Sequence, residues 1–213
     1  LLIHSDLGTR ELIYRVQGTT DKNKVMDKCL NNVNSKKQME EEMREVTKTF
    51  LEEIKIREIK IPKEDIQHLK DLALYVTQMR AMGDFDRTHD LRNKVTPEEP
   101  TRILKQLKRY YIFLMNLDKK YDREKALRIL RHLARSSSYQ NRIKVMDYLW
   151  EWYKRDRKSI YEISEALKLG RGTIKRECLI LESLGLIECQ RKEQLNDRIL
   201  YRFTAIKNPS TII

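Results

Sequence analysis

Apolar residues near the C-terminus recur at helical spacing in two short runs that a turn separates. Ile160, Ile163 and Leu167 lie three and four residues apart, which predicts one apolar face of a short helix. A second run follows after Leu169 and Gly170, and it stops just before Gly185, where helices commonly end. Its members are Ile174, Cys178, Leu181 and Leu184. The pattern predicts a helix-turn-helix between Ser159 and Leu186.

The segments on either side of this helix pair extend the prediction. Residues 142–155 form a run with a wide apolar face and predict a further helix before the pair. After the pair, Ile187–Arg191 and Arg198–Thr204 alternate apolar and polar residues, with a polar tip at Lys192–Asp197, which predicts a β-hairpin. Three helices followed by a two-stranded wing are typical of a winged helix.

Two further helices are expected upstream, at Thr101–Leu117 and from Asp122 to about Ala134. Each has an apolar stripe at spacings of three and four. The short connection at 118–121 favours antiparallel neighbours. Ser136–Ser138 forms a polar break, which we interpret as a domain boundary between residues 1–135 and residues 142–207.

A long helix is expected from Glu64 to about Gly83 and Asp84. Its expected buried stripe contains Ile66, Leu69, Leu72, Ala73, Val76 and Met79. The irregular segment Phe85–Glu99 then predicts a structured loop between two helices, and long loops of this kind are often functional.

The first sixty residues give weaker patterns. Leu12–Val16 favours a short strand, and Asp21–Leu30 favours a short helix. Ser35 and Gln38 form a capping box that predicts the start of a stronger helix, and Lys55–Pro62 is expected to be a linker or an edge strand. The apolar stripe of that stronger helix consists of Met39, Met43, Val46, Phe50 and Ile54.

Composition agrees with a mainly α protein, because the 213 residues include only 6 glycines and 4 prolines. The net charge of +12 is unevenly distributed. Residues 1–100 hold 18 Lys+Arg and 19 Asp+Glu, whereas residues 101–135 hold 11 and 3, and residues 142–207 hold 15 and 10. A basic excess confined to the second half indicates a polyanionic partner, with nucleic acid as the first candidate.

Candidate DNA contacts lie on the second helix of the pair, opposite its apolar face, and on the wing. Arginine and lysine can read guanine edges or neutralise phosphates, and a helix N-terminus favours a phosphate. The candidates are Arg171, Thr173, Lys175, Arg176, Arg191, Lys192 and Arg198. The alternative is that the wing binds another protein and that these cations form an ordinary solvated surface.

Catalytic signals are weak in comparison. The chain has no phosphate-binding GxxxxGK[ST] loop and no GxGxxG. Asp84, Asp86 and Asp90 lie beside His89, but their spacing fits no metal loop, so we expect a solvated or capping role and no metal site. The three cysteines show no CxxC pair and are expected to be reduced thiols, with Cys178 packed on an apolar helix face.

Several segments together resemble a known family. GTRELIYRV, EDIQHLKDLALYVTQMRA, LRNKVTPEEPTRILKQLKRYYIFL and the terminal winged helix resemble, in that order, the C-terminal half of AAA+ ATPases that are encoded mainly by mobile elements and are similar to minichromosome-maintenance helicases. PTRILKQL, Pro100 to Leu107, is the most specific part. The resemblance implies that residues 1–135 correspond to the end of an AAA+ module and its lid.

The resemblance also implies roles for three arginines. Arg102 falls on the sensor-2 position of the lid, whose guanidinium can fork onto nucleotide phosphate oxygens, while a solvated arginine is the alternative. Arg87 and Arg92 would be arginines that act on a neighbouring subunit. No nucleotide-binding core is visible in the chain, so this chain alone is not expected to hydrolyse ATP, and ATP with Mg²⁺ would belong to a longer parent protein.

The expected function is therefore that of a DNA-binding region of a helicase-like ATPase. It would be a cytoplasmic, nucleoid-associated protein that contacts DNA largely through the backbone, without a membrane segment, and that could form a homo-oligomer through the lid region. The alternative is a stand-alone winged-helix transcriptional regulator with a helical dimerisation region.

Overall fold

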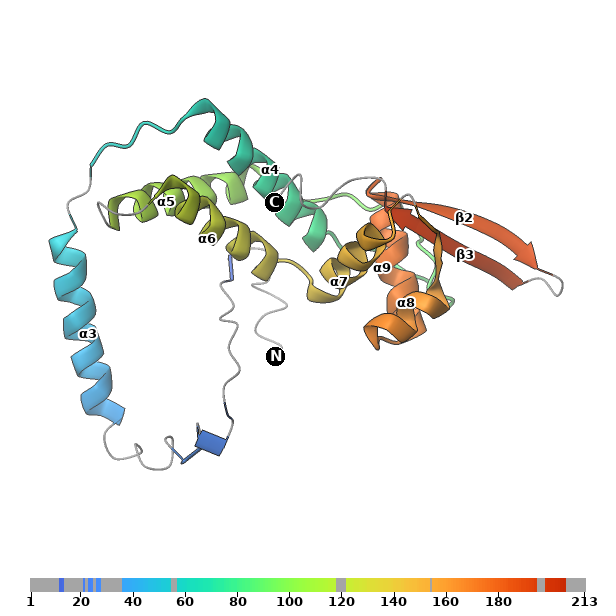
Figure 1. Cartoon of the computed structure of the whole chain (residues 1–213), viewed down its shortest axis with the longest axis horizontal. Coiled ribbons are helices and arrows are strands. Elements are labelled where there is room, and N and C mark those ends of the chain that lie inside the picture. Colours follow the sequence, from blue (N-terminus) through green and yellow to red (C-terminus); the bar gives the residue numbers. More distant parts are fainter. Residues whose placement is uncertain are drawn as a thin grey trace.

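The computed structural model describes residues 12–13, 21, 23–24, 26–27, 36–54, 57–117, 122–153, 155–194 and 198–205. This part of the chain is mainly helical, with a small three-stranded antiparallel sheet near the C-terminus. Figure 1 shows a group of helices on one side, the sheet on the other, and helix α3 extending away from the helical group, with its C-terminal end near α5.

Three helices form the first group: α4 (Lys63–Arg80), α5 (Thr101–Leu117) and α6 (Arg123–Ser136). The sequence predicted the start and end of α5 correctly, and it placed the start of α6 within one residue, because Asp122 is the N-cap and accepts a hydrogen bond from the Glu124 amide. The α4 stripe is buried except at Ile66, in the first turn, which is 39% exposed. Helix α4 also ends at Arg80, earlier than expected.

A polar contact inside this helical group joins its three members. The Asp65 carboxylate at the start of α4 accepts a 2.6 Å hydrogen bond from the Tyr111 hydroxyl of α5 and pairs at 2.6 Å with Arg123 of α6. Asp65 is only 1% exposed, and burial alone would raise its pKa. The hydrogen bonds from Arg123 and Tyr111 outweigh burial and hold the pKa of Asp65 below its ordinary value.

The C-terminal part contains α7 (Gln140–Glu151), β1 (Lys158–Ser159), α8 (Ile160–Leu167), α9 (Arg171–Ser183), β2 (Ile187–Gln194) and β3 (Arg198–Ala205). The strand order is β1-β3-β2, with both pairs antiparallel. The helix expected at 142–155 starts two residues earlier and stops at Glu151, where Trp152 leaves the helical conformation. The hairpin agrees with the prediction, although β2 continues to Gln194 and shortens the expected polar tip.

Strand β1 is the element that the sequence did not predict. It has two residues, and Lys158 and Ser159 pair with Phe203 and Arg202. Two residues are too few to show an alternating pattern, so only the pairing with β3 reveals the strand.

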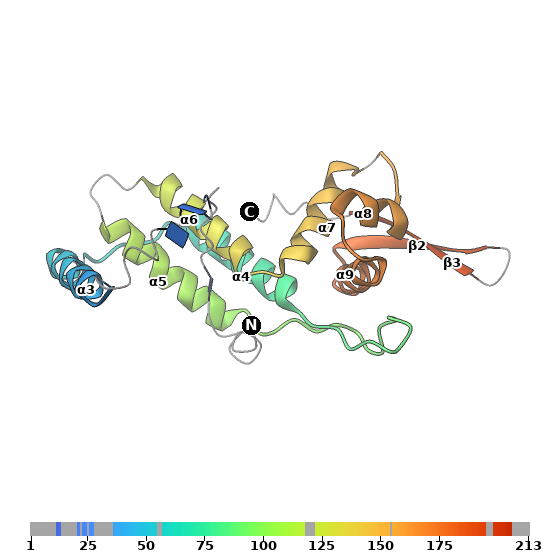
Figure 2. The ribbon, with the colours of Figure 1, turned by 90° about the horizontal axis from the view of Figure 1, so that it is seen from below.

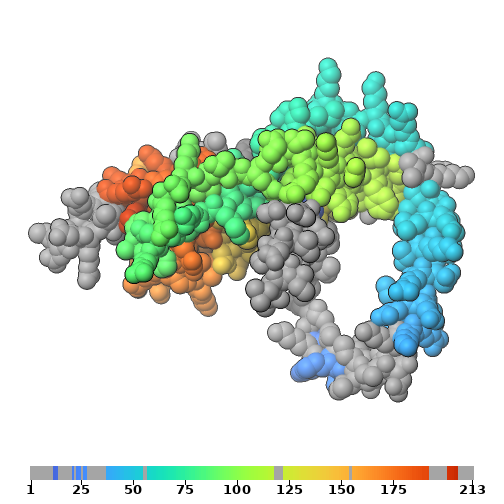
Figure 3. Space-filling view, turned by 180° about the vertical axis from the view of Figure 1, so that it is seen from behind, coloured from blue at the N-terminus to red at the C-terminus, as the bar shows by residue number. Residues whose placement is uncertain are grey.

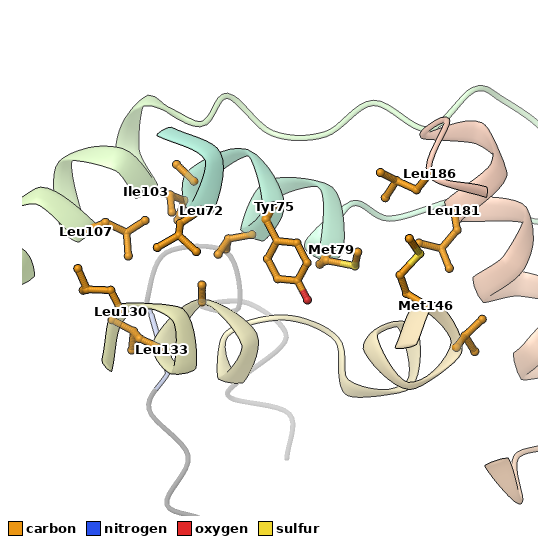
Figure 4. Close-up of a cluster of buried hydrophobic side chains, with 14 of the residues drawn as sticks. Leu72, Tyr75, Met79, Ile103, Leu107, Leu130, Leu133, Met146, Leu181 and Leu186 are labelled. Atoms are coloured by element: carbon orange, nitrogen blue, oxygen red, sulfur yellow. The ribbon is translucent and has the colours of Figure 1, made fainter. Parts of the chain in front are cut away.

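The connection between α6 and α7 is buried. Ser136, Ser137 and Ser138 are at most 7% exposed, and the Ser137 carbonyl accepts a 2.7 Å hydrogen bond from Arg80. One hydrophobic cluster continues across this connection, from Leu72 and Leu107 to Met146 and Leu181. Figure 4 shows this row of side chains running from the helical group to the region of α9. The hydrophobic core is therefore continuous across the domain boundary that the sequence predicted between residues 135 and 142.

Helix α3 (Lys36–Glu53) confirms the helix expected after Ser35, although Ser35 itself lies outside the described residues. Its apolar stripe is exposed, with Met43 at 69% and Val46 at 70%. Residues 57–62 are a linker and not a strand, as one of the two alternatives held.

The elements predicted for the first thirty residues lie mostly outside the residues that the structure describes. Residues 23–24 and 26–27 are helical within the expected short helix. Of the expected strand at 12–16, Leu12 and Ile13 are described, and they are not in a strand; the Ile13 amide donates to the Ser137 hydroxyl at 2.6 Å instead of to a neighbouring strand.

Candidate nucleic-acid interface

The helix pair α8–α9 positions the candidate contacts. Ser159 caps α8 through a capping box with Glu162, in which the Ser159 hydroxyl accepts from the Glu162 amide and Glu162 accepts from the Ser159 amide. Lys168 ends α8 with a φ of 52°, and α9 begins three residues later, with Gly170 as an N-cap that makes no side-chain hydrogen bond. Gly185, at a φ of 66°, turns the chain toward β2 as the sequence predicted.

The four candidates on α9 lie in different surroundings. Arg171 is exposed, and its guanidinium lies 4.7 Å from the centre of the Tyr161 ring, within the range of a cation–π contact. Arg176 is also exposed, whereas Thr173 is half-buried. These three side chains are positioned at the first turns of the helix.

Lys175 differs because its ammonium group already has partners within the chain. Its Nζ lies 2.9 Å from the Asp90 Oδ1 and donates to the Thr88 carbonyl at 3.0 Å. The same ammonium lies 5.2 Å from the centre of the Tyr201 ring on β3. The Lys175 side chain is only 18% exposed as a result.

Asp90 and Thr88 belong to the α4–α5 loop (residues 81–100), which runs along α9. Figure 2 shows this loop leaving α4 and passing beside α9 toward the sheet. The Val95 amide donates to the Ser183 hydroxyl at 2.9 Å, and Ile180 packs with Ala81 and Val95 in a separate apolar cluster. The structured loop that the sequence predicted is confirmed, and its docking on α9 is new.

Asp86 holds a turn within this loop, and Asp90 connects the loop to α9. The Asp86 carboxylate accepts hydrogen bonds from the Thr88 amide, the Thr88 hydroxyl and the Asp90 amide, which fixes a tight turn. Hydrogen bonding by the Asp90 backbone is the main cause that lowers the pKa of Asp86. Burial acts to raise the pKa of Asp90, but hydrogen bonds from Lys175 and Thr88 bring it below its ordinary value. Asp86 therefore holds a turn of the loop and not a helix end, and Asp84 is exposed, as the solvated alternative held.

The wing candidates are placed by the two strands. Arg191 on β2 is exposed, pairs with Glu182 of α9 at 3.2 Å and lies 5.9 Å from the centre of the Tyr201 ring. Lys192 pairs with Leu200 across the hairpin, and Arg198 pairs with Gln194, but their side chains lie outside the described ones. Glu182 therefore fixes Arg191 at the side of α9.

The three arginines of the family resemblance lie at or near the α4–α5 loop. Arg102, in the first turn of α5, pairs with Glu98 at 2.6 Å and stays partly exposed. Arg87 is exposed within the turn, and Arg92 is exposed with its guanidinium 4.0 Å from the Asp84 carboxylate. Arg87 and Arg92 are thus close in sequence to Thr88 and Asp90, the loop residues that contact α9.

Arg142 is a structurally important residue that sequence reasoning missed. It is 2% exposed, and its Nε lies 2.7 Å from a carboxylate oxygen of Glu177 on α9. Its Nη1 donates to the Met79 and Ala81 carbonyls at the end of α4, at 3.1 and 2.6 Å. A lone arginine at the start of a helix resembles any solvated one, so no local signal could have identified it.

The two described cysteines are free thiols. Cys178 is fully buried, as predicted for the apolar face of α9, and burial raises the pKa of its thiol well above the ordinary value. Cys189 on β2 is half-buried, and burial raises its pKa to about 11. Both thiols are therefore protonated near neutral pH.

No model of a protein family matches this chain, and no curated protein or solved structure matches it. Within the described ranges, no three His, Cys, Asp or Glu side chains group closely enough to hold a metal ion. None of the described helices is long and apolar enough to cross a membrane.

Proposed function

We propose that this chain is the DNA-binding C-terminal region of an AAA+ helicase-like ATPase from a mobile genetic element. Residues 140–205 would act as a winged helix that binds duplex DNA largely through its phosphates, and the preceding helices would correspond to the ATPase lid. The order helix, strand, two helices and hairpin, with sheet order β1-β3-β2, agrees with a winged helix. This nucleoid-associated role needs no nucleotide bound by the chain itself.

The exposed cations at the first turns of α9 are the single observation that carries the proposal. Arg171 opens α9, where the first backbone amides are unpaired and a phosphate is favoured, and Arg176 is exposed in the second turn. Gly170 places no side chain over those amides, which leaves room for a ligand oxygen. The basic excess after residue 100 supports a polyanionic partner in the same way.

Fluorescence anisotropy with a labelled duplex tests this proposal. If four to six phosphates are neutralised, log Kd should change with log salt with a slope of roughly 4 to 5 in magnitude. A scrambled duplex should bind with similar affinity. Replacing Arg171→Gln and Arg176→Gln together should reduce the slope by about 2, because two phosphate contacts are lost.

A matched control keeps the change of charge the same. Lys125→Gln with Arg128→Gln also removes two exposed cations, but these lie on α6, away from α9. We expect this control to leave the salt slope unchanged. Binding that does not depend on salt, or equal losses for the two double variants, would contradict the proposed DNA contact.

A second candidate function is a stand-alone winged-helix regulator with a helical dimerisation region. The observation in its favour is the exposed stripe of α3, in which Met39, Met43, Val46 and Phe50 follow spacings of four, three and four. This candidate predicts a dimer in solution and a strong preference for a palindromic site. A monomer that binds scrambled duplex equally well would contradict it.

The sensor-2 role of Arg102 belongs to the first candidate alone. Its guanidinium is held by Glu98 in this chain, so a nucleotide phosphate would have to compete with that carboxylate. A parent protein that contains a nucleotide-binding core is the proper setting for this test. There, Arg102→Ala should reduce ATP hydrolysis, whereas Lys105→Ala, at an exposed position of the same helix, should not.

A further inference from the structure

The outer face of α9 is occupied over most of its length by the chain's own α4–α5 loop. The loop approaches α9 at Gly172, Lys175, Ile180 and Ser183, from the first turn of the helix to the last. A Cβ atom at Gly172 would lie 3.3 Å from the His89 ring, so the loop reaches the beginning of α9. In the view from behind, this loop lies over the C-terminal region (Figure 3). Arg176 stays exposed between these contacts, so the loop covers part of this face of α9.

The loop is held by apolar and polar contacts at several points, which makes it part of the fold. Ile180 is 4% exposed, and its cover consists of Ala81 and Val95. Lifting the loop would return these apolar side chains to water and would break the Lys175–Asp90 ion pair at the same time. The Asp90 carboxylate also accepts a hydrogen bond from the Tyr201 hydroxyl on β3, so the loop is tied to the sheet as well.

The α4–α5 loop exposes three basic side chains, whereas three of its five acidic side chains are half-buried and hold contacts within the chain, namely Asp86, Asp90 and Glu98. Arg87, Arg92 and Lys94 are exposed. Asp86 accepts hydrogen bonds within its own turn, and Asp90 pairs with Lys175. Asp84 and Glu99 remain exposed, and Asp84 lies 4.0 Å from Arg92. The docked loop therefore carries three exposed cations, and Arg87 is the sequence neighbour of Thr88, whose carbonyl accepts a hydrogen bond from Lys175 of α9.

We propose that the α4–α5 loop is a nucleic-acid-binding element, and that Arg87, Arg92 and Lys94 contact DNA phosphates together with Arg171 and Arg176. Lys175 then has a positioning role, since its ammonium holds the loop on α9 through Asp90 and Thr88. The ligand class is a phosphodiester backbone, which cations recognise without reading base edges. This inference rests on the proposed DNA-binding function and assigns its contacts to a loop that lies outside the helix pair and the wing.

The first experiment removes the loop cations. In the full chain, Arg87→Gln, Arg92→Gln and Lys94→Gln together should weaken duplex binding by about tenfold or more and reduce the salt slope by about 2 to 3. The matched control is Lys63→Gln, Lys70→Gln and Lys125→Gln, three exposed cations on α4 and α6. Equal effects of the two triple variants would overturn the assignment.

The second experiment asks whether the docked loop presents cations to DNA or blocks access to α9. Asp90→Asn weakens docking and also removes one negative charge, and Asp84→Asn removes an exposed negative charge without a contact to α9. If the docked loop binds DNA, Asp90→Asn should bind more weakly than Asp84→Asn. If the loop is an inhibitory cover, Asp90→Asn should bind several-fold more tightly, because Lys175 becomes free, and the proposal is then wrong.

Loop position and DNA binding can be measured separately. Hydrogen exchange of the amides at 86–92 should become faster in Asp90→Asn and stay unchanged in Asp84→Asn, without any DNA present. If the unmodified chain binds no duplex even at low salt, the proposed function fails, and this inference fails with it. If the unmodified chain binds and only the loop variants behave like the control, the proposed function stands and the loop assignment is overturned.

Discussion

On one flank of α9, Glu177 meets the guanidinium of Arg142; on the other, Lys175 meets the carboxylate of Asp90. The first pair is buried, with 2% of the Arg142 side chain and 17% of the Glu177 side chain exposed. In the second pair, the corresponding fractions are 18% for Lys175 and 44% for Asp90. Similar charges at similar distances therefore occupy different dielectric surroundings along one helix.

The difference in exposure determines what each ion pair contributes to the fold. Around Arg142, carbonyl groups of α4 satisfy the guanidinium together with Glu177, so the pair fixes α9 against α4 and α7. Around Lys175, water competes with Asp90, so the pair orients the loop at a modest gain in stability. The buried pair fixes helices against one another, and the more exposed pair holds the α4–α5 loop on α9.

The largest expected effect comes from breaking the buried flank. Arg142→Ala leaves the Glu177 carboxylate and the last α4 carbonyls without their partner, which should lower the free energy of unfolding by about 3 to 5 kcal/mol. Urea denaturation followed by circular dichroism measures it. A loss below about 1 kcal/mol would show that Arg142 does not carry this contact.

A smaller effect is expected from the apolar cluster beneath the loop. Ile180→Ala removes buried methylene and methyl groups from the contact with Ala81 and Val95, and it should cost about 2 to 4 kcal/mol. The comparable change Ile66→Ala, at the exposed start of α4, should cost less than about 1 kcal/mol. If the two variants lose the same stability, the loop is not packed on α9 as described.

The exposed flank should respond to salt and acid. Lys175→Met should cost at most about 1 kcal/mol, and the cost should shrink at high salt. Because the folded-state pKa of Asp90 is lowered, its contribution to stability is present above the unfolded-state value near 4 and is lost as pH falls through the folded value. In thermal melts between pH 3 and 7, the melting temperatures of the unmodified chain and of Lys175→Met should therefore become similar at the acid end.

The smallest effect is expected where the pair is most exposed. Arg191→Ala breaks the contact with Glu182, and we expect a change of about 0.5 kcal/mol or less in the free energy of unfolding. The same variant isolates the wing's share of DNA binding, because the fold is hardly altered. A stability loss as large as that of Arg142→Ala would remove the distinction between buried and exposed pairs.

Local patterns predicted the helices well, because an apolar stripe depends only on residues three and four positions apart in the sequence. The bounds of α5 and the turn at Gly185 follow directly from spacing and from glycine chemistry. The capping box of Ser159 and Glu162 could have been found by the same reasoning, since it is a serine followed three residues later by a glutamate.

The candidate site was only partly predictable, because its side chains contact residues that are far away in the sequence. The sequence identified Lys175 as a cation on a helix surface, but its partner Asp90 lies 85 positions away along the chain, and no local period connects the two. The same holds for Arg142 and the carbonyls of α4. The stripe of α3 shows a further limit, because periodicity predicts which face is apolar but not whether another surface covers it.

The buried connection at Ser136–Ser138 has a mechanical consequence. A flexible hinge needs solvated backbone, whereas here Ser137 is hydrogen-bonded to Arg80 and the core continues on both sides. We therefore expect α4, α7 and α9 to move together as one rigid body. A rotation of the helical group would displace the wing with it. A force applied to the wing would be transmitted to the N-terminal end of α4.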